Sequence, residues 1–108
     1  MKAARNVRLV LVTAPDRKTA RALARVALAS HLVACANFIP GIESHYWWKR
    51  KLERSREILI LFKTTRNKIA ALEKLVLKHH PYDTAEFISL PLDSSTPRYL
   101  EWLVASVC

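Results

Sequence analysis

Two adjacent histidines, His79 and His80, stand directly before Pro81 and are the side chains of this sequence best suited to metal chemistry. Imidazole nitrogens bind copper(II), zinc(II) and related ions. Neighbouring helical positions point about 100° apart, whereas a helical metal pair prefers residues that are four apart. The pair therefore has two interpretations. It is a metal site, or a helix end at which His79 meets the last carbonyl groups and His80 lies in a turn or interface. The spacing favours the helix end, with weak metal binding.

The two cysteines point to a reducing compartment rather than to a disulfide-stabilised fold. Cys35 lies between alanines in VACAN, a context typical of a small buried residue in a strand. Cys108 is the last residue and is expected to be an exposed thiol. Because the sequence has no Cys-x-x-Cys or His-x-x-x-His spacing, a structural zinc site is not expected.

The charge and composition limit the classes of function. The chain has 18 Lys and Arg against 9 Asp and Glu, a formal charge of +9 that permits anionic partners without establishing them. Gly41 is the single glycine, so a glycine-rich phosphate loop is excluded. Ser44 and Ser89 lack a nucleophile-elbow context, and the sequence predicts no enzyme. Glu57 and Glu86 are expected to meet across strands, a weak sign of a site by itself. No apolar segment approaches the length of a membrane span.

An aromatic stretch, HYWW at residues 45–48, precedes the basic segment KRKLERSR at residues 49–56. Aromatic and cationic side chains together can stack on bases and contact phosphates. Alternate strand residues face opposite ways, so a strand end with a solvated basic hairpin tip is the favoured interpretation. The strand REILILFK lacks the glycine and exposed aromatics of RNA-recognition motifs. We therefore expect weak, non-specific nucleic-acid binding at most.

The elements that must position these residues follow the order βαββαβ, with an extra C-terminal helix. This order predicts one α+β domain over residues 1–108, with a ferredoxin-like antiparallel sheet that carries two helices on one face. Asp16 is expected to cap the first helix, Thr64 or Thr65 the second, and Thr96-Pro97 to begin the third. Four strands are expected, over residues 9–12, 33–39, 57–63 and 86–92, and the second continues over residues 42–48. The expected helices start near residues 17, 65 and 97. The first helix ends near residue 30 and the second ends at Pro81.

The first and third predicted strands are apolar on both faces, although helices can cover only one face. The other face must be covered by the extra helix or by another subunit. The sequence therefore favours an oligomer.

The ordered motifs resemble the CutA divalent-cation tolerance family along nearly the whole chain. They are LVTAPD, LASHLVACANFIPGIES, HYWW with KLE, ILILFKTT, LVLKHHPYDTAEFISLPL and YLEWL. The resemblance implies a cytoplasmic homotrimer with an architecture similar to PII signalling proteins, linked to tolerance of copper and other divalent metals. It implies no assigned reaction.

The resemblance also implies the site residues. A copper site of bacterial relatives uses a first-strand cysteine and a histidine pair; here Val12 stands at the first position, and His79, His80 and Cys35 are the predicted metal residues. Copper(II) or another divalent cation is expected to bind weakly. A ligand site in an inter-subunit cleft is predicted from residues that supply an anion contact, a hydroxyl and an acceptor: Lys63, Tyr82 and Glu86.

Two alternatives remain open. One is a small-anion binding or signalling module, by analogy with PII architecture. The other is a weak nucleic-acid binder that uses the basic hairpin. Arg50 also stands where the family usually has a hairpin glycine, so the resemblance predicts a longer or differently shaped tip.

Overall fold

Four strands form one antiparallel sheet in the order β3-β4-β2-β5, in a computed structural model that describes residues 1–107. Cys108, predicted to be an exposed thiol, lies outside the described residues. The strands are β2 (Val7–Ala14), β3 (Cys35–Trp48), β4 (Lys51–Thr65) and β5 (Ile88–Pro91). The predicted βαββαβ order is confirmed, and the two central strands are the apolar segments identified in the sequence.

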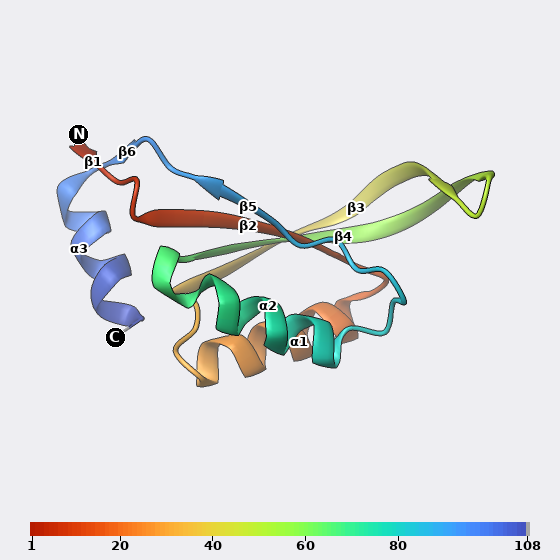
Figure 1. Ribbon diagram of the computed structural model, residues 1–108, viewed down its shortest axis with the longest axis horizontal. Helices are drawn as coiled ribbons and strands as arrows, with labels where there is room; N and C mark the ends of the chain where they lie inside the picture. Colours follow the sequence, from red (N-terminus) through yellow and green to blue (C-terminus); the bar gives the residue numbers. More distant parts are fainter. Residues whose placement is uncertain (108) are drawn as a thin grey trace.

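Two helices, α1 (Arg17–Ala29) and α2 (Ile69–His79), pack against one face of this sheet (Figure 1). The core lies between them and the sheet, and each fully buried aliphatic or aromatic side chain there stabilises the fold by about 1.5–3 kcal/mol. Its largest members, none more than 1% exposed, are Val10, Val12, Leu23, Ile60, Phe62, Leu72 and Val76.

Both ends of α1 follow from local chemistry. Asp16 caps the N-terminus as predicted, because its carboxylate accepts a hydrogen bond from the backbone N–H of Thr19 at 2.8 Å. At the C-terminus, His31 has a φ of +55°, and its N–H donates to the carbonyl of Leu28 at 3.0 Å. The bond belongs to a Schellman-type helix end, with histidine where glycine is more common.

The predicted cap of the second helix is wrong. A 3-10 turn over Arg66–Lys68 precedes α2, and Thr65 at its start makes no side-chain capping bond. Thr64 is buried, and its hydroxyl instead donates to the carbonyl of Leu32 at 2.6 Å. The C-terminal end agrees with the prediction, because His80 before Pro81 has an extended ψ of 137°.

The basic segment is mostly strand rather than hairpin tip, which corrects the sequence prediction. Trp48 pairs with Lys51, and only Lys49 and Arg50 form the turn, with φ values of +49° and +66°. Positive φ at both central residues is typical of a type I′ turn, so the turn is short despite the missing glycine. A bulge at Gly41 interrupts the pairing, and the hairpin then extends well beyond β2 and β5 (Figure 1).

The C-terminal helix α3 (Pro97–Ser106) begins at proline as predicted, but it does not cover the open sheet face. It lies at the end of the molecule where β2 begins, beside a small sheet of β1 (Lys2–Ala3) and β6 (Ser94–Ser95) that was not predicted (Figure 1). A second small core forms there from Ala4, Val7, Leu100 and Leu103. The first of the two covers expected for the open face, the extra helix, therefore lies elsewhere.

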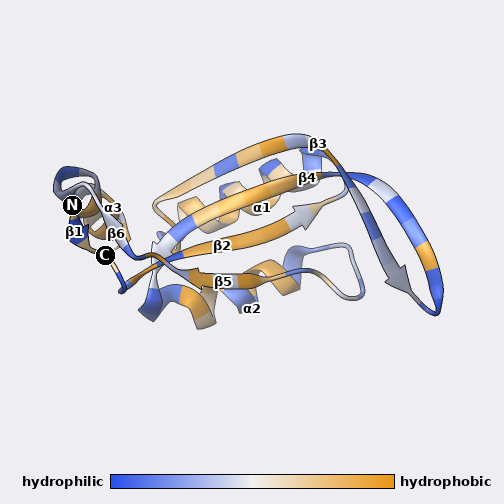
Figure 2. Cartoon of the chain, turned by 90° about the horizontal axis from the view of Figure 1, so that it is seen from above, coloured by the Kyte–Doolittle hydropathy of each residue, from blue (hydrophilic) through white to orange (hydrophobic). Residues whose placement is uncertain are grey.

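The open face is apolar across all four strands of the large sheet. In Figure 2, hydrophobic colouring continues through successive residues of β2 and the body of β4, whose side chains alternate between the two faces. By register, the open-face side chains include the partly buried Leu9, Leu11, Leu59 and Leu61 and the more exposed Ile39 (44%), Ile88 (45%) and Leu90 (42%). Among residues 1–107, no helix is long and apolar enough to cross a membrane.

Candidate functional site

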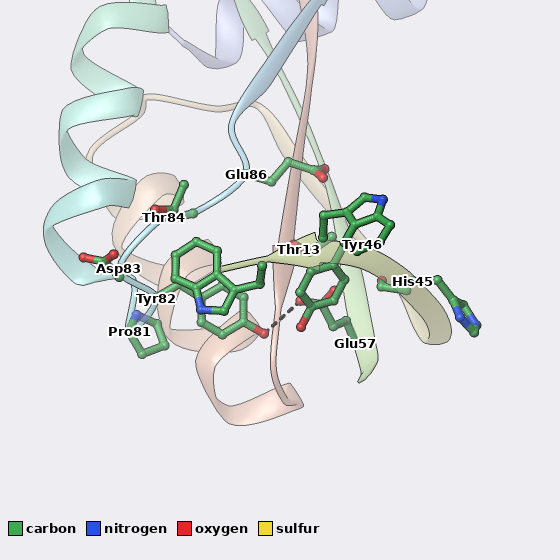
Figure 3. A pocket seen from close by; sticks show the side chains of 13 residues that line it. Thr13, His45, Tyr46, Glu57, Pro81, Tyr82, Asp83, Thr84 and Glu86 are labelled. Atoms are coloured by element: carbon green, nitrogen blue, oxygen red, sulfur yellow. Dashed lines mark hydrogen bonds between the residues drawn. The ribbon is translucent and has the colours of Figure 1, made fainter. Parts of the chain in front are cut away.

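A cavity of about 840 Å³ opens where the end of β2, the part of the long hairpin beyond the Gly41 bulge and the connection from α2 to β5 meet (Figure 3). This size is typical of pockets that hold small molecules. Three structural segments line it, with the residues Thr13, Ser44, His45, Tyr46, Trp47, Trp48, Glu57, Pro81, Tyr82, Asp83, Thr84, Ala85 and Glu86.

Glu57 lies at the base of this cavity and is only 6% exposed. The hydroxyl of Tyr82 donates to its Oε2 at 2.8 Å, as the dashed line in Figure 3 shows. Burial, followed by this hydrogen bond, raises the pKa of Tyr82 far above its ordinary value. Tyr82 is therefore a fixed hydroxyl donor, and Glu57 is a buried carboxylate held in one orientation.

Glu86 supplies a second carboxylate to the same cavity. Burial raises the pKa of Glu86, and the negative charge of Glu57 raises it further. Glu57 and Glu86 line one cavity, but they do not meet across paired strands as expected, because Glu86 precedes β5 and β5 pairs with β2. Because two neighbouring carboxylates repel, the cavity is electrostatically suited to a positively charged occupant.

His80 is buried and uses both ring nitrogens in the fold. Its Nε2–H donates to the carbonyl of Thr13 at 2.7 Å, and its Nδ1 accepts the backbone N–H of Tyr82 at 3.1 Å. The network assigns this tautomer, since a carbonyl accepts and an N–H donates. β5 pairs with β2 only as far as Leu11. Beyond that point, the ring of His80 supplies a hydrogen-bond donor to the Thr13 carbonyl of β2. Its role in the fold is to position Tyr82, and neither ring nitrogen is available for a metal.

His79 is exposed and is not among the residues that line the cavity. Its Nδ1 donates to the carbonyl of Leu75 at 3.0 Å, as expected at a helix end. Its Nε2 makes no hydrogen bond within residues 1–107. The two histidines therefore do not form one ligand pair, and His79 alone offers a ring nitrogen to solvent.

Cys35 and Lys63 lie elsewhere on the sheet, where they pair across β3 and β4. Lys63 is six residues from Glu57 along β4, which corresponds to about 20 Å. Its Nζ donates to the hydroxyl of Tyr99 at 3.2 Å. Cys35 is partly exposed rather than buried as predicted, with its Sγ 3.4 Å from Oδ1 of Asn37.

Within one subunit, the residues predicted for the ligand site and those predicted for the metal site therefore do not all come together. Tyr82 and Glu86 are together, whereas Lys63 does not line their cavity. His79, His80 and Cys35 do not converge, and residues 1–107 contain no group of three His, Cys, Asp or Glu residues that fits a metal ion. A tight metal site does not fit the residues of a single chain.

The sequence interpretation missed the aromatic side of the cavity. Since Ile42 pairs with Glu57, alternation along β3 places Ser44, Tyr46 and Trp48 on the same face as Glu57. Figure 3 shows Tyr46 beside Glu57. The signal was present in HYWW, but the register across the Gly41 bulge and the position of the α2–β5 connection are needed to interpret it.

The comparisons with known proteins all indicate the same family. The model of the CutA1 divalent ion tolerance protein family matches residues 8–106. The chain is 46% identical over 99 residues to the divalent-cation tolerance protein CutA of Escherichia coli O139:H28 (strain E24377A), covering 92% of this chain and 88% of that one.

Solved structures of this family have the same fold. CutA1 from Oryza sativa superimposes with a TM-score of 0.91 at 38% identity, over 94% of each chain. The protein from Archaeoglobus fulgidus, described as a periplasmic divalent cation tolerance protein CutA, superimposes with a TM-score of 0.90 at 30% identity, over 94% of this chain and 98% of that one.

Proposed function

Because this chain belongs to the CutA1 divalent ion tolerance family, we propose that it acts in copper tolerance, as a cytoplasmic homotrimer without catalytic activity. The observation that carries the proposal is the match over residues 8–106, which includes the sheet, both core helices and the histidine pair. The chemistry of the described side chains supports a binding or response role, because no activated nucleophile accompanies the three carboxylates that line the cavity.

Weak copper(II) binding at the exposed end of α2 is the metal chemistry that we propose. His79 supplies an accessible imidazole nitrogen there, while His80 is engaged in the fold. Copper(II) is the divalent first-row ion that nitrogen ligands bind most tightly. One imidazole without converging partners supports weak, reversible binding rather than a permanent site.

The trimer is supported by the open sheet face and by the family resemblance. The apolar side chains of the open face extend across β2, β4 and β5, and an exposed apolar surface of this kind is typical of a protein interface. We propose that neighbouring subunits cover this face in a PII-like arrangement. The cavity at the edge of the face then lies next to a subunit boundary, as the resemblance implies for the ligand site.

The two alternative functions have less support. A small-anion module requires positive groups at the cavity, but its described lining contains three carboxylates, Glu57, Asp83 and Glu86, and no Lys or Arg. The basic side chains of the hairpin, such as Arg50 and Arg54, support only weak, salt-sensitive contact with nucleic acid. Membrane association is not part of the proposal.

Calorimetric titration with copper(II) and zinc(II) tests the metal part of the proposal. We expect copper(II) to bind more tightly than zinc(II), and the affinity to fall on acidification as imidazole takes up a proton. His79→Ala should remove most of the copper binding. His31→Asn is the matched control, because it removes an exposed imidazole at a positive-φ position that asparagine tolerates.

Two results would contradict this proposal. Stoichiometric zinc(II) binding at nanomolar concentration would show a preformed site that the described residues do not provide. Copper(II) binding that is unchanged in His79→Ala would exclude His79 as the ligand. In cells, loss of the protein should lower the copper concentration at which growth stops, and the intact gene should restore it.

A further inference from the structure

We propose that the cavity binds an organic ammonium ion, with the carboxylates of Glu57 and Glu86 contacting the charged nitrogen and the surrounding aromatic rings contacting its apolar body. This site is separate from the copper contact at His79, and the inference does not rest on copper tolerance. It rests on the composition of the cavity, which differs from that of the rest of the chain.

The charge of the cavity is opposite to that of the protein. The chain has a net charge of +9, yet the cavity lining includes Glu57, Asp83 and Glu86 and no Lys or Arg. Glu57 is only 6% exposed. Burying a carboxylate costs free energy unless the charge is paired. One oxygen accepts the Tyr82 hydroxyl, but no cation pairs with Glu57 within residues 1–107. A cationic ligand would supply the missing partner.

Aromatic rings provide the second half of the site. Tyr46 and Tyr82 line the cavity beside Glu57, and the faces of such rings attract ammonium groups by cation–π interaction. The chain itself shows this chemistry at the rim, because Nζ of Lys49 lies 5.6 Å from the centre of the Trp48 ring. Two rings beside one of two neighbouring carboxylates form a combination that recognises an alkyl or aryl ammonium ion.

A metal ion fits this cavity less well. The carboxylates do not form a group of three ligands among residues 1–107, while calcium takes six to eight oxygen ligands and magnesium six. The Tyr82 hydroxyl is held in its protonated form and already donates to Glu57. The cavity volume of about 840 Å³ suits a small organic molecule rather than a bare ion.

Three probes of similar shape and different charge test the inference on the intact protein. Benzylamine is a cation at neutral pH, benzyl alcohol is neutral and benzoate is an anion. Tryptophan fluorescence reports the titrations, since Trp47 and Trp48 line the cavity and Trp102 lies on α3. We expect benzylamine to bind at least about tenfold more tightly than either of the other two, which corresponds to the loss of a charge-assisted contact.

Two isosteric variants locate the binding, and a third is the control. Glu86→Gln and Glu57→Gln each remove one charge from the cavity, and each should weaken benzylamine binding by about tenfold or more. Glu101→Gln removes the same charge from exposed α3 and should leave the affinity unchanged. Glu86→Gln keeps the test informative if Glu57→Gln does not fold.

Four results would overturn the inference. They are equal affinity for benzylamine and benzyl alcohol, a preference for benzoate, benzylamine binding that is unchanged in Glu86→Gln, and displacement of benzylamine by copper(II) in the variant His79→Ala. The last result would assign the cavity to a metal. Copper(II) binding at His79 can fail without affecting any of these measurements, so the two proposals are tested separately.

Discussion

The two faces of the large sheet have similar sequences and different surroundings. On β4, Ile60 and Phe62 face the helices and are fully buried, while the alternate Leu59 and Leu61 face outward and stay partly exposed. On β2, Val10 is fully buried and its neighbour Leu11 is not. The chain therefore encodes a sheet with two apolar faces, although its own helices cover only one of them.

The same contrast applies to the two histidines at the end of α2. His80 is 8% exposed and makes two side-chain hydrogen bonds, whereas His79 is exposed and its ring donates to a carbonyl of its own helix. Neighbouring residues of one chemical type therefore have a structural role and a surface role. The adjacent pair in the sequence does not converge on one site within the chain.

Phe62→Ala and Leu61→Ala compare the two faces most strongly. Phe62→Ala should lower the free energy of unfolding by about 3–5 kcal/mol, because it leaves a cavity in the core. Leu61→Ala should cost less in the dissociated subunit, about 1 kcal/mol, because its side chain keeps access to solvent. Chemical denaturation at low protein concentration measures both, and equal losses would contradict the distinction between the faces.

His80→Ala and His79→Ala compare the two histidines. His80→Ala should lower the free energy of unfolding by about 1–3 kcal/mol, because it leaves the Thr13 carbonyl and the Tyr82 N–H without their partners. His79→Ala removes one exposed bond and should change it by less than about 0.5 kcal/mol. Thermal denaturation distinguishes the two, and a neutral His80→Ala would contradict the structural role.

Much of the fold was predictable from the sequence because its signals are local. Apolar runs predicted the central strands, Asp16 predicted the start of α1, and Pro81 predicted the end of α2. The predictions failed where the backbone depends on distant partners. Thr64 was expected to cap a helix, but its hydroxyl reaches Leu32 across the fold.

The candidate site was only partly predictable. Tyr82 and Glu86 lie close in sequence and share the cavity, while Lys63 is at the other end of its strand. The aromatic contribution of β3 depends on a register set by the Gly41 bulge, which spacing alone does not reveal. The basic segment was misinterpreted because charge is typical of a loop, although two residues with positive φ are enough to close this hairpin.

Arg50→Gly tests the backbone geometry of the turn of the long hairpin, which extends beyond β2 and β5. Arg50 has a φ of +66°, a conformation that costs most residues about 1–2 kcal/mol and glycine little. The substitution should raise the free energy of unfolding by about 0.5–1 kcal/mol. Arg54→Gly on β4 is the control and should lower it by a similar amount. A loss of stability in Arg50→Gly would contradict the turn geometry.

Glu86→Gln should show the smallest effect, at the cavity beside the open face. Because the folded-state pKa of Glu86 is raised, its protonated form favours folding, and that stability is lost as the pH rises through the folded-state pKa. Glutamine imitates the protonated form, so the variant should be more stable than the parent at pH 7 by less than about 1 kcal/mol. The gain should vanish as the pH falls below 4.5, the ordinary value.

Thermal denaturation between pH 3 and pH 8 measures this difference. Glu73→Gln on the exposed side of α2 is the matched control, because it removes the same charge outside the cavity. A gain for Glu86→Gln that grows on acidification would have the wrong sign and would contradict a pKa of Glu86 raised by burial and by the charge of Glu57.

We propose that other copies of this chain cover the open sheet face, and light scattering coupled to size exclusion is the direct test. At low micromolar concentration we predict a mass three times the 12.4 kDa of one chain. Leu90→Asp on the open face should give the single-chain mass, whereas Leu77→Asp on exposed α2 should not. A parent protein that elutes with the mass of one chain would contradict the claim.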